Sequence, residues 1–206
     1  MPSSTENPWD VRYASRDTLY GHAPNAFFAA TLATLPPGTL LLPCDGEGRN
    51  AIAAAQAGWD VEAFDGSTVA IDRLHTRAAA AGVAPRASVA DAFAFTPSLP
   101  SFSCVALIFA HFPPEARTAF HRRAASWVAP GGTLLLEAFH PDQTAHTSGG
   151  PRDPSWLLTC DLLRADLDGT GLHIESCTAT TTVLDEGPLH QGTAAVVRLV
   201  AVREQG

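Results

Sequence analysis

The chain has 206 residues, of which 46% are hydrophobic and 17% are charged, and its formal net charge is −8. This length and composition predict one globular domain with a full hydrophobic core, and they exclude an intrinsically disordered chain. The acidic balance and the absence of Lys argue against a nucleic-acid partner, because phosphate binding needs clustered Lys and Arg.

The N-terminal residues 1–35 are predicted to form a lid and a short helix. The segment is polar but carries aromatic side chains, among them Trp9 and Tyr20. A helix is expected near 24–35, because the Pro-Pro-Gly run at 36–38 then breaks the chain. An aromatic arm ahead of the first strand indicates a segment that closes over a pocket, although simple packing of the arm would explain the same residues.

Strand-like and helix-like patterns then alternate along the chain. Short apolar runs are typical of parallel strands that are buried on both faces. Ala-rich or amphipathic runs that end at Gly or Pro are typical of the connecting helices. The predicted strands are 39–44, 60–65, 87–91, 104–110 and 133–139, and the predicted helices are 49–58, 68–81, 114–128 and 155–166.

The last two strand-like runs, 172–184 and 193–203, have no helix between them. We expect them to form an antiparallel hairpin at one edge of the sheet. Five parallel strands and this hairpin predict an α/β fold with a Rossmann-like, doubly wound, seven-stranded sheet. One domain is expected over 1–206, with its core in 36–206. The hairpin disfavours a dehydrogenase, whose sheet typically has six parallel strands.

The strongest site signal is PCDGEGRN, residues 43–50, between the first predicted strand and the first core helix. Ligands of open α/β sheets bind at the carboxyl ends of the strands, where this loop lies. Gly46 and Gly48 would let the backbone approach a ligand. Amides at the helix start could hold a carboxylate, and Asp45 could hold an amino group. The loop fits the amino-acid end of a methionine-like ligand, although a simple turn could have the same residues.

Two further carboxylates end the second and third predicted strands. Asp65 lies about twenty residues after the loop's aspartate, a position that suits a bidentate hydrogen bond to ribose hydroxyls. Alternatively it caps the next helix, a role that Ser67 could fill instead. Asp91, or the backbone at Ala92 and Phe93, is placed to contact an adenine ring, although a lone Asp after a strand is commonly a turn residue.

Together these motifs resemble the class I S-adenosylmethionine (SAM)-dependent methyltransferases. The similarity is greatest to a small bacterial group near the tellurite-resistance and thiopurine methyltransferases, and to the methyltransferase domain of ovothiol-synthesising enzymes. It rests on WDVRY (9–13), YGHAPNAFF (20–28), PCDGEGRNA (43–51), VEAFDGS (61–67), FAHFPP (109–114) and VAPGGTLLLEAFHP (128–141). The common GxGxG loop is reduced here to Gly46-Glu47-Gly48.

The resemblance implies a methyltransferase that binds SAM and releases S-adenosylhomocysteine (SAH). It also implies that Asp45, Gly46, Gly48, Asp65 and Asp91 contact the cofactor. The full set of positions that we expect around SAM adds residues of the lid and of the strand ends. These are Arg12, Tyr20, Pro43, Asn50, Gly66, Ser67, Ala92, Phe93, Phe109 and Ala110.

Two histidines are predicted to be catalytic. His111 and His140 follow the fourth and fifth predicted strands, so they could share the pocket of the methyl acceptor. Either could act as a base toward a thiol or a ring nitrogen. Metal binding and a plain surface position are the alternatives, and we expect no metal. Methyl transfer to a thiolate or a neutral amine depends mainly on alignment, so a methyltransferase does not require such a base.

The acceptor is predicted to be a small molecule, with a thiol or a related soft nucleophile as the first choice. An imidazole-type metabolite such as a thiohistidine is an alternative, as is a SAM-binding protein without turnover. The segment after the fourth strand reads FAHFPP rather than an NPPY-like motif, which would hold a flipped base or an amide. We expect no membrane or nucleic-acid partner, and a monomer or homodimer.

The four cysteines, Cys44, Cys104, Cys160 and Cys177, show no metal-ligand spacing. Cys44 and Cys104 lie in apolar segments and are expected to be small buried residues. No apolar run is long enough to span a bilayer, and the N-terminus lacks the pattern of a secretory signal. We therefore expect a cytoplasmic protein with reduced thiols.

Overall fold

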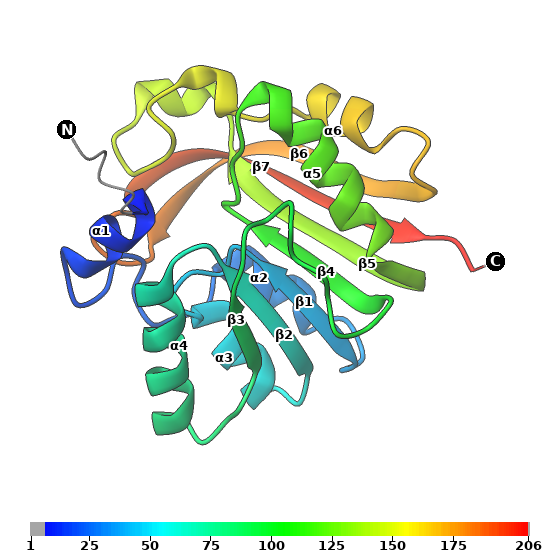
Figure 1. Ribbon diagram of the computed structural model, residues 1–206. Coiled ribbons are helices and arrows are strands. Elements are labelled where there is room, and N and C mark those ends of the chain that lie inside the picture. Colours follow the sequence, from blue (N-terminus) through cyan, green and yellow to red (C-terminus); the bar gives the residue numbers. More distant parts are fainter. Residues whose placement is uncertain (1–6, 206) are drawn as a thin grey trace, which may run out of the picture.

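The computed structural model describes residues 7–205, so residues 1–6 and 206 of the predicted 1–206 domain and its 1–35 lid lie outside the described residues. Figure 1 shows the arrangement of the elements. In chain order they are α1 (Pro8–Ala14), α2 (Ala26–Leu32), β1 (Thr39–Pro43), α3 (Arg49–Gln56), β2 (Asp60–Asp65), α4 (Thr68–Ala80), β3 (Arg86–Val89), β4 (Phe102–Ile108), α5 (Pro114–Ser126), β5 (Val128–Phe139), the 3₁₀ turns η1 (Pro141–Ala145) and η2 (Pro154–Trp156), α6 (Cys160–Leu167), β6 (Leu172–Asp185) and β7 (Gln191–Arg203).

The strands form one seven-stranded sheet in the order β3-β2-β1-β4-β5-β7-β6. Strands β1 to β5 pair in parallel, and β7 pairs antiparallel with both β5 and β6. The predicted fold class, with a C-terminal hairpin at one sheet edge, is confirmed. The direction of winding reverses between β1 and β4, and such a reversal opens a crevice at the carboxyl ends of the two strands.

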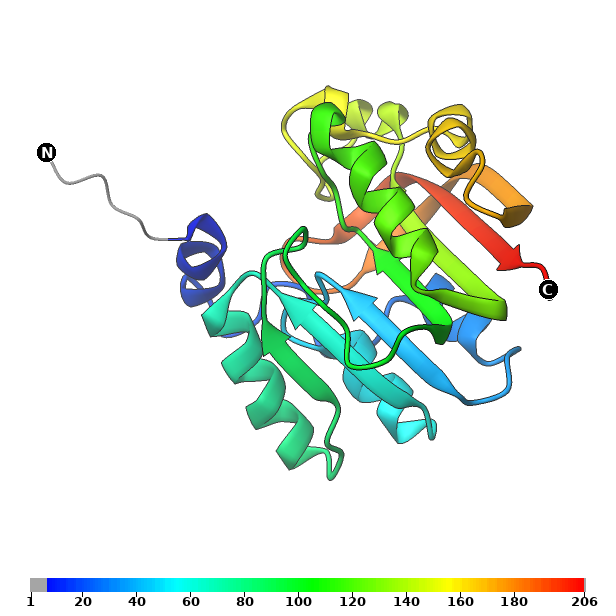
Figure 2. The same cartoon turned by 45° about the vertical axis from the view of Figure 1, so that its right-hand side comes forward.

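Alternating side chains of the central strands divide the core into two layers. Leu41 of β1 packs with residues of α5 and α6, whereas Leu40 and Leu42 pack with residues of α2, α3 and α4. This follows from the two-residue period of a strand, which sends successive side chains to opposite faces. Helices therefore cover both faces of the sheet, as Figures 1 and 2 show.

Three element boundaries differ from the sequence prediction. A helix, α1, occupies part of the predicted lid and begins after Asn7, whose side chain accepts a hydrogen bond from the amide of Trp9. β5 begins at Val128, so it includes the Pro-Gly-Gly run 130–132 and starts before the predicted strand 133–139. The predicted helix 155–166 is wrong in its first half, because extended chain follows η2 and the Thr159 hydroxyl caps a helix that begins only at Cys160.

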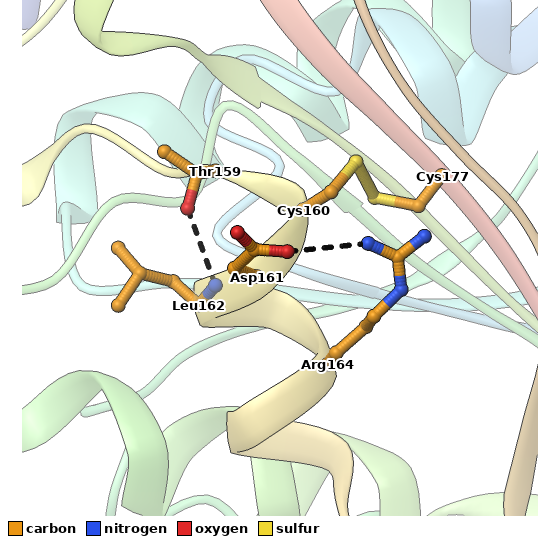
Figure 3. The surroundings of a disulfide bond; sticks show 6 residues. All are labelled: Thr159, Cys160, Asp161, Leu162, Arg164 and Cys177. Carbon is orange, nitrogen blue, oxygen red and sulfur yellow. Dashed lines mark hydrogen bonds and ion pairs between the residues drawn. A yellow bond between two sulfur atoms is a disulfide. The ribbon is translucent and has the colours of Figure 1, made fainter.

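Cys160 and Cys177 form a disulfide bond, so the expectation of four reduced thiols is wrong (Figure 3). Cys160 is the first residue of α6, and Cys177 lies in β6, with 5.7 Å between their Cα atoms. The bond ties α6 to the edge strand that it packs against. Cys44 and Cys104 are free, as expected, but only Cys104 is fully buried, whereas Cys44 is partly buried. Among residues 7–205, no helix combines the length and the apolarity needed to cross a membrane.

Candidate active site

A cavity of about 240 Å³ lies at the carboxyl ends of β1 to β4, in the crevice where the strand order reverses. One part of its wall consists of the strand-end loops 43–50, 65–67, 90–92 and 108–112. The other part is a cover formed by residues 9–25 and the β6–β7 turn 185–191. The lining residues are Trp9, Tyr13, Tyr20, Gly21, Cys44, Asp45, Glu47, Arg49, Asn50, Asp65, Gly66, Ala90, Asp91, Ala92, Ile108, Phe109, Ala110, His111, Phe112 and His190.

The backbone turns sharply at both strand ends that flank the crevice. Cys44, after β1, and Phe109, after β4, adopt left-handed conformations with φ of 57° and 55°. Non-glycine residues in such conformations cost about 1–3 kcal/mol each and concentrate at ligand-binding sites. The two outliers therefore mark the crevice as the functional end of the sheet, independently of the cavity itself.

The two glycines of loop 43–50 make room for other parts of the protein. A Cβ on Gly46 would lie 2.3 Å from the hydroxyl oxygen of Tyr13, and one on Gly48 would lie 2.3 Å from Cγ of Leu74 in α4. Gly48 also has a φ of +81°, which disfavours side chains. Neither glycine lines the cavity. Close packing of the cover and of α4 is therefore one reason for these glycines, and backbone approach to a ligand stays a prediction.

Asp45 stabilises the start of α3 from within the cavity wall. Its carboxylate accepts hydrogen bonds from the amide of Ala51, at 3.1 Å, and from Nδ2 of Asn50, at 2.9 Å. Burial raises the pKa of Asp45 to about 7, although these two hydrogen bonds oppose the shift. The helix start that was expected to hold a ligand carboxylate is thus capped in part by Asp45 itself.

Asp65 joins the first two strand-end loops. Its carboxylate accepts from the amides of Gly46, at 3.0 Å, and Ser67, at 2.9 Å. Burial raises its pKa, and these amides oppose that shift. Ser67 caps α4 by accepting from the amide of Ala70, so Asp65 itself is left to face the cavity. The alternative that Asp65 is the cap of this helix is wrong.

Asp91 closes the turn that follows β3. Its Oδ1 accepts from the amides of Phe93, at 2.9 Å, and Ala94, at 3.1 Å, while the residue lines the cavity together with Ala92. The turn role and the ligand-facing role that the sequence left open are therefore compatible. Phe93 is absent from the cavity wall, and its ring packs against that of Phe112 at 5.6 Å between centroids.

Glu47 holds the N-terminal half of the cover against the strand-end loops. Its carboxylate accepts from the amide of Leu19, at 3.0 Å, and from Arg73 of α4, at 2.8 Å. Glu47 is only 4% exposed, so the ion pair is shielded from solvent. Asn50 adds a second link, because its side-chain oxygen accepts from the amide of Asn25 at 2.9 Å.

Arg49 connects the two halves of the cover. Its guanidinium forms a buried ion pair with Glu186 at 2.7 Å and donates to the carbonyl oxygen of Tyr20 at 3.2 Å. A buried pair of this kind costs desolvation of both charges, so breaking it would leave an uncompensated charge. The polar side chains of the GEGRN run, those of Glu47, Arg49 and Asn50, thus attach residues 18–25 and the β6–β7 turn to the loop.

The cavity has an aromatic end at which the cover meets the loop after β4. The ring of His190 lies 4.6 Å from that of Tyr20 and 4.5 Å from that of Phe109, measured between centroids. Phe139 packs behind Phe109 at 4.6 Å. The carboxylates of the cavity wall lie on the strand-end loops instead; they belong to Asp45, Glu47, Asp65 and Asp91.

Both ring nitrogens of His111 are engaged by the main chain. Nδ1 lies 3.0 Å from the carbonyl oxygen of Trp156, and Nε2 accepts from the amide of Phe139 at 3.2 Å. Burial lowers the pKa of His111 to about 4, so the ring is neutral at pH 7. His111 lines the cavity, but this geometry connects β4, β5 and η2 and leaves neither nitrogen free to act as a base.

His140 is outside the cavity wall. Its Nδ1 accepts from the amide of Asp142 at 3.3 Å and so caps the 3₁₀ turn η1. The structure therefore does not bring His111 and His140 together in one pocket. Within residues 7–205, no group of three or more His, Cys, Asp or Glu side chains is arranged to hold a metal ion.

Of the positions expected around SAM, most of those at the strand ends and one from the lid line the cavity. Those that line the cavity are Tyr20, Asp45, Asn50, Asp65, Gly66, Asp91, Ala92, Phe109 and Ala110. Those that do not are Arg12, Pro43, Gly46, Gly48, Ser67 and Phe93. Arg12 instead lies over the ring of Trp9 at 5.1 Å.

Among the residues of the cavity wall that the sequence prediction missed are Glu47, Arg49 and His190, which carry charge or titrate. The first two stood within the recognised GEGRN run, so their position next to the glycines was an available signal. For His190 the only signal was its place in a hairpin turn, which does not show that the turn reaches the cavity.

Comparisons with known proteins agree with this architecture. Residues 42–132 match a family model described as a methyltransferase domain. A solved structure that concerns the conversion of a disulfide bond into a thioacetal group during echinomycin biosynthesis is similar with a TM-score of 0.78 and 20% identity, over 95% of this chain and 90% of that one. TehB from Haemophilus influenzae is similar with a TM-score of 0.70 and 15% identity, over 95% and 66%.

Magnesium protoporphyrin IX methyltransferase (ChlM) from Synechocystis PCC 6803, solved with bound SAH, is similar with a TM-score of 0.67 and 20% identity, over 98% of this chain and 90% of that one. At these identities the likeness shows a common fold. A comparison with curated protein sequences gives no significant match.

Proposed function

We propose that this chain, which resembles the class I SAM-dependent methyltransferases in sequence and in fold, transfers the methyl group of SAM to a small-molecule acceptor. One observation carries the proposal: a covered cavity lies at the reversal of strand order, and Asp45, Asp65 and Asp91 line it together with aromatic rings. Bound SAM would supply an electrophilic methyl group on a sulfonium.

The residues present fit this cofactor. Asp65 accepts one amide on each carboxylate oxygen, and since a carboxylate has about four acceptor positions, two remain for ribose hydroxyls. Asp91 and Ala92 would contact the adenine ring, and Asp45 the ammonium group. The aspartates Asp45, Asp65 and Asp91 in one cavity wall also suit a ligand that carries an ammonium and a sulfonium, because a nearby positive charge favours the ionised form of a carboxylate.

The shape of the cavity supports a small acceptor. The cover is attached to the strand-end loops by buried ion pairs and hydrogen bonds. A macromolecular acceptor would need an open groove or rim. Water exclusion and alignment of the acceptor, which methyl transfer needs, are supplied by the same closure.

A thiol or a related soft nucleophile is the first candidate for the acceptor, because the aromatic end offers polarisable surfaces to a sulfur atom. An imidazole-type metabolite is the second candidate. Its flat ring would stack against Tyr20 or Phe109, whose rings line that end.

Calorimetry with SAM, SAH and NAD tests the cofactor. We expect micromolar or tighter binding of SAM and SAH, and tight binding of NAD without SAM would contradict the proposal. A screen of small thiols and imidazoles with SAM then tests the reaction. Binding of SAM without methylation of either class would indicate a SAM-binding protein without methyl transfer to these acceptors.

A further inference from the structure

The turn between β6 and β7 places a histidine in the wall of the cavity. His190 lines the aromatic end although its side chain is only 5% exposed. Its ring contacts those of Tyr20 and Phe109, which line the same end. An imidazole in this position is within reach of an acceptor bound there, and its position depends on the cover being closed.

One ring nitrogen of His190 is a buried polar atom that needs an explanation. Nδ1 is buried without a hydrogen bond, and the nearest carboxylate oxygen, Oε2 of Glu186, lies 3.5 Å away. Buried polar atoms without partners are rare in folded proteins and concentrate at functional sites. A neutral ring with its proton on Nδ1, directed at Glu186, accounts for this atom and leaves Nε2 as a proton acceptor.

Glu186 is held as an ionised carboxylate behind this ring. It accepts from Arg49 at 2.7 Å and from Nδ2 of Asn25 at 2.9 Å. Burial alone would raise its pKa, but the interactions with His190 and Arg49 lower it to about 2. A carboxylate fixed in this way beside an imidazole orients the ring and stabilises its protonated form.

The electrostatic surroundings keep His190 neutral at pH 7. Burial is the largest influence and lowers its pKa, Glu186 opposes this, and the positive charges of Arg49 and Arg12 reinforce it. The titratable and charged groups that face His190 are Glu186, Arg49, Arg12, Tyr20 and His111. A neutral imidazole is the form that can accept a proton. The other histidine of the cavity, His111, has both nitrogens bonded to the main chain.

We propose that His190, oriented by Glu186, is the general base that takes a proton from the methyl acceptor, an inference that rests on the proposed function. For a thiol acceptor, a bond forms between the acceptor sulfur and the methyl carbon. The sulfonium–methyl bond breaks, and its electron pair stays on the departing sulfur. The S–H proton passes to Nε2 of His190 and then to solvent. The substrate class is therefore acceptors that arrive protonated at pH 7.

The test replaces His190 by Gln, which keeps a polar side chain but cannot take up a proton. Two probes are used: an alkanethiol that is mostly protonated at pH 7, and an aromatic thiol that is already ionised there. We expect H190Q to lower kcat/KM for the alkanethiol by about 10²–10⁴-fold, the usual effect of a lost general base. The loss for the ionised thiol should be much smaller, because it has no proton to give up.

The pH dependence provides a signature that a purely structural role would not change. In the wild type, the alkanethiol rate should fall as pH drops through the pKa of His190, because the protonated ring cannot accept a proton. In H190Q the rate should instead rise by about tenfold per pH unit up to the pKa of the thiol, since only the thiolate reacts.

Two further measurements accompany the kinetics. Calorimetric affinity for SAH should be the same in H190Q and the wild type, which separates this inference from cofactor binding. Histidine proton NMR titrations of the wild type and of Glu186→Gln should be compared. The pKa of His190 should be lower in the variant, because a negative charge is removed. His75→Gln, on the exposed side of α4, is the matched control and should change none of these quantities.

Several outcomes would overturn the assignment. Equal losses for both thiols would mean that His190 only shapes the cavity, and unchanged rates would mean that it has no part in the reaction. If H190Q does not fold, a wild-type profile without the acid limb, or a pKa of His190 that is insensitive to Glu186→Gln, would be equally decisive. Absence of SAH binding in the wild type would contradict the proposed function instead.

Discussion

The strand-end loops and the cover enclose one cavity, but different interactions hold them in place. Asp65 and Asp91 are fixed by hydrogen bonds to backbone amides of the strand-end loops themselves. Tyr20 and His190 are positioned by contacts between segments that are distant in sequence, above all the Arg49–Glu186 ion pair, whose partners are 137 residues apart.

This difference indicates that the strand-end loops and the cover have different roles. Hydrogen bonds within the strand-end loops preorganise the carboxylates of Asp65 and Asp91 whether or not the cover is present. The aromatic end is complete only when residues 18–25 and the β6–β7 turn dock on the GEGRN loop. We therefore expect changes in the strand-end loops to affect cofactor binding first, and changes in the cover to affect turnover first.

Removing residues 1–22 should give the largest loss of turnover, and it should separate turnover most clearly from cofactor binding. The deletion takes away Tyr20 and the Leu19 amide that bonds Glu47, so water enters the aromatic end and the acceptor is no longer aligned. Turnover should be abolished, whereas SAH binding should be weakened but retained. Circular dichroism would verify that the sheet remains folded. A truncated protein with full activity would disprove the role of the cover.

Gly48→Ala should destabilise the strand-end loops most. A Cβ there would lie 2.3 Å from Leu74 Cγ, and the φ of +81° would be strained as well. Overpacking and the left-handed conformation together should lower the free energy of unfolding by about 2–5 kcal/mol. Gly82→Ala is the matched control, since Gly82 has a φ of +71° but open space around its Cβ position. Equal denaturation midpoints for both variants would refute the packing role of Gly48.

The disulfide lies outside the cavity wall, so its loss tests a region that belongs to neither the strand-end loops nor the cover. Neither Cys160 nor Cys177 lines the cavity, and 17 residues separate them in sequence. Cys177→Ser should lower the free energy of unfolding by about 3 kcal/mol, as expected for a loop of this length. SAH affinity at 25 °C should not change. An altered SAH affinity would show that α6 and β6 communicate with the cavity.

Asp65→Asn should produce the smallest of these effects. The amide keeps the shape of the side chain but removes the charge and one acceptor, so SAM binding should weaken by about 1–3 kcal/mol. Ser67→Ala is the comparison, because it removes the cap of α4 and should cost about 0.5–2 kcal/mol of stability without a matching loss of affinity. An unchanged dissociation constant for Asp65→Asn would mean that this carboxylate serves the loops alone.

The sequence by itself determined the parts of this protein that local patterns specify. Apolar runs and their breaks at Gly and Pro predicted the strands and the terminal hairpin, because burial of a parallel strand requires such runs. The same reasoning placed Asp65 and Asp91 at strand ends that meet in one crevice, and both carboxylates line the cavity. Such features can be predicted without knowledge of any long-range contact.

Only the tertiary structure decided which side chains the long-range contacts bring together. Two histidines, His111 and His190, line the cavity, and only hydrogen bonds from η2 and β5 show that the nitrogens of His111 are already occupied. The Cys160–Cys177 bond likewise exists because α6 packs on β6. The physical reason is common to both: these partners are joined by docking of whole elements, which depends on the shapes of the packed layers and not on spacing along the chain.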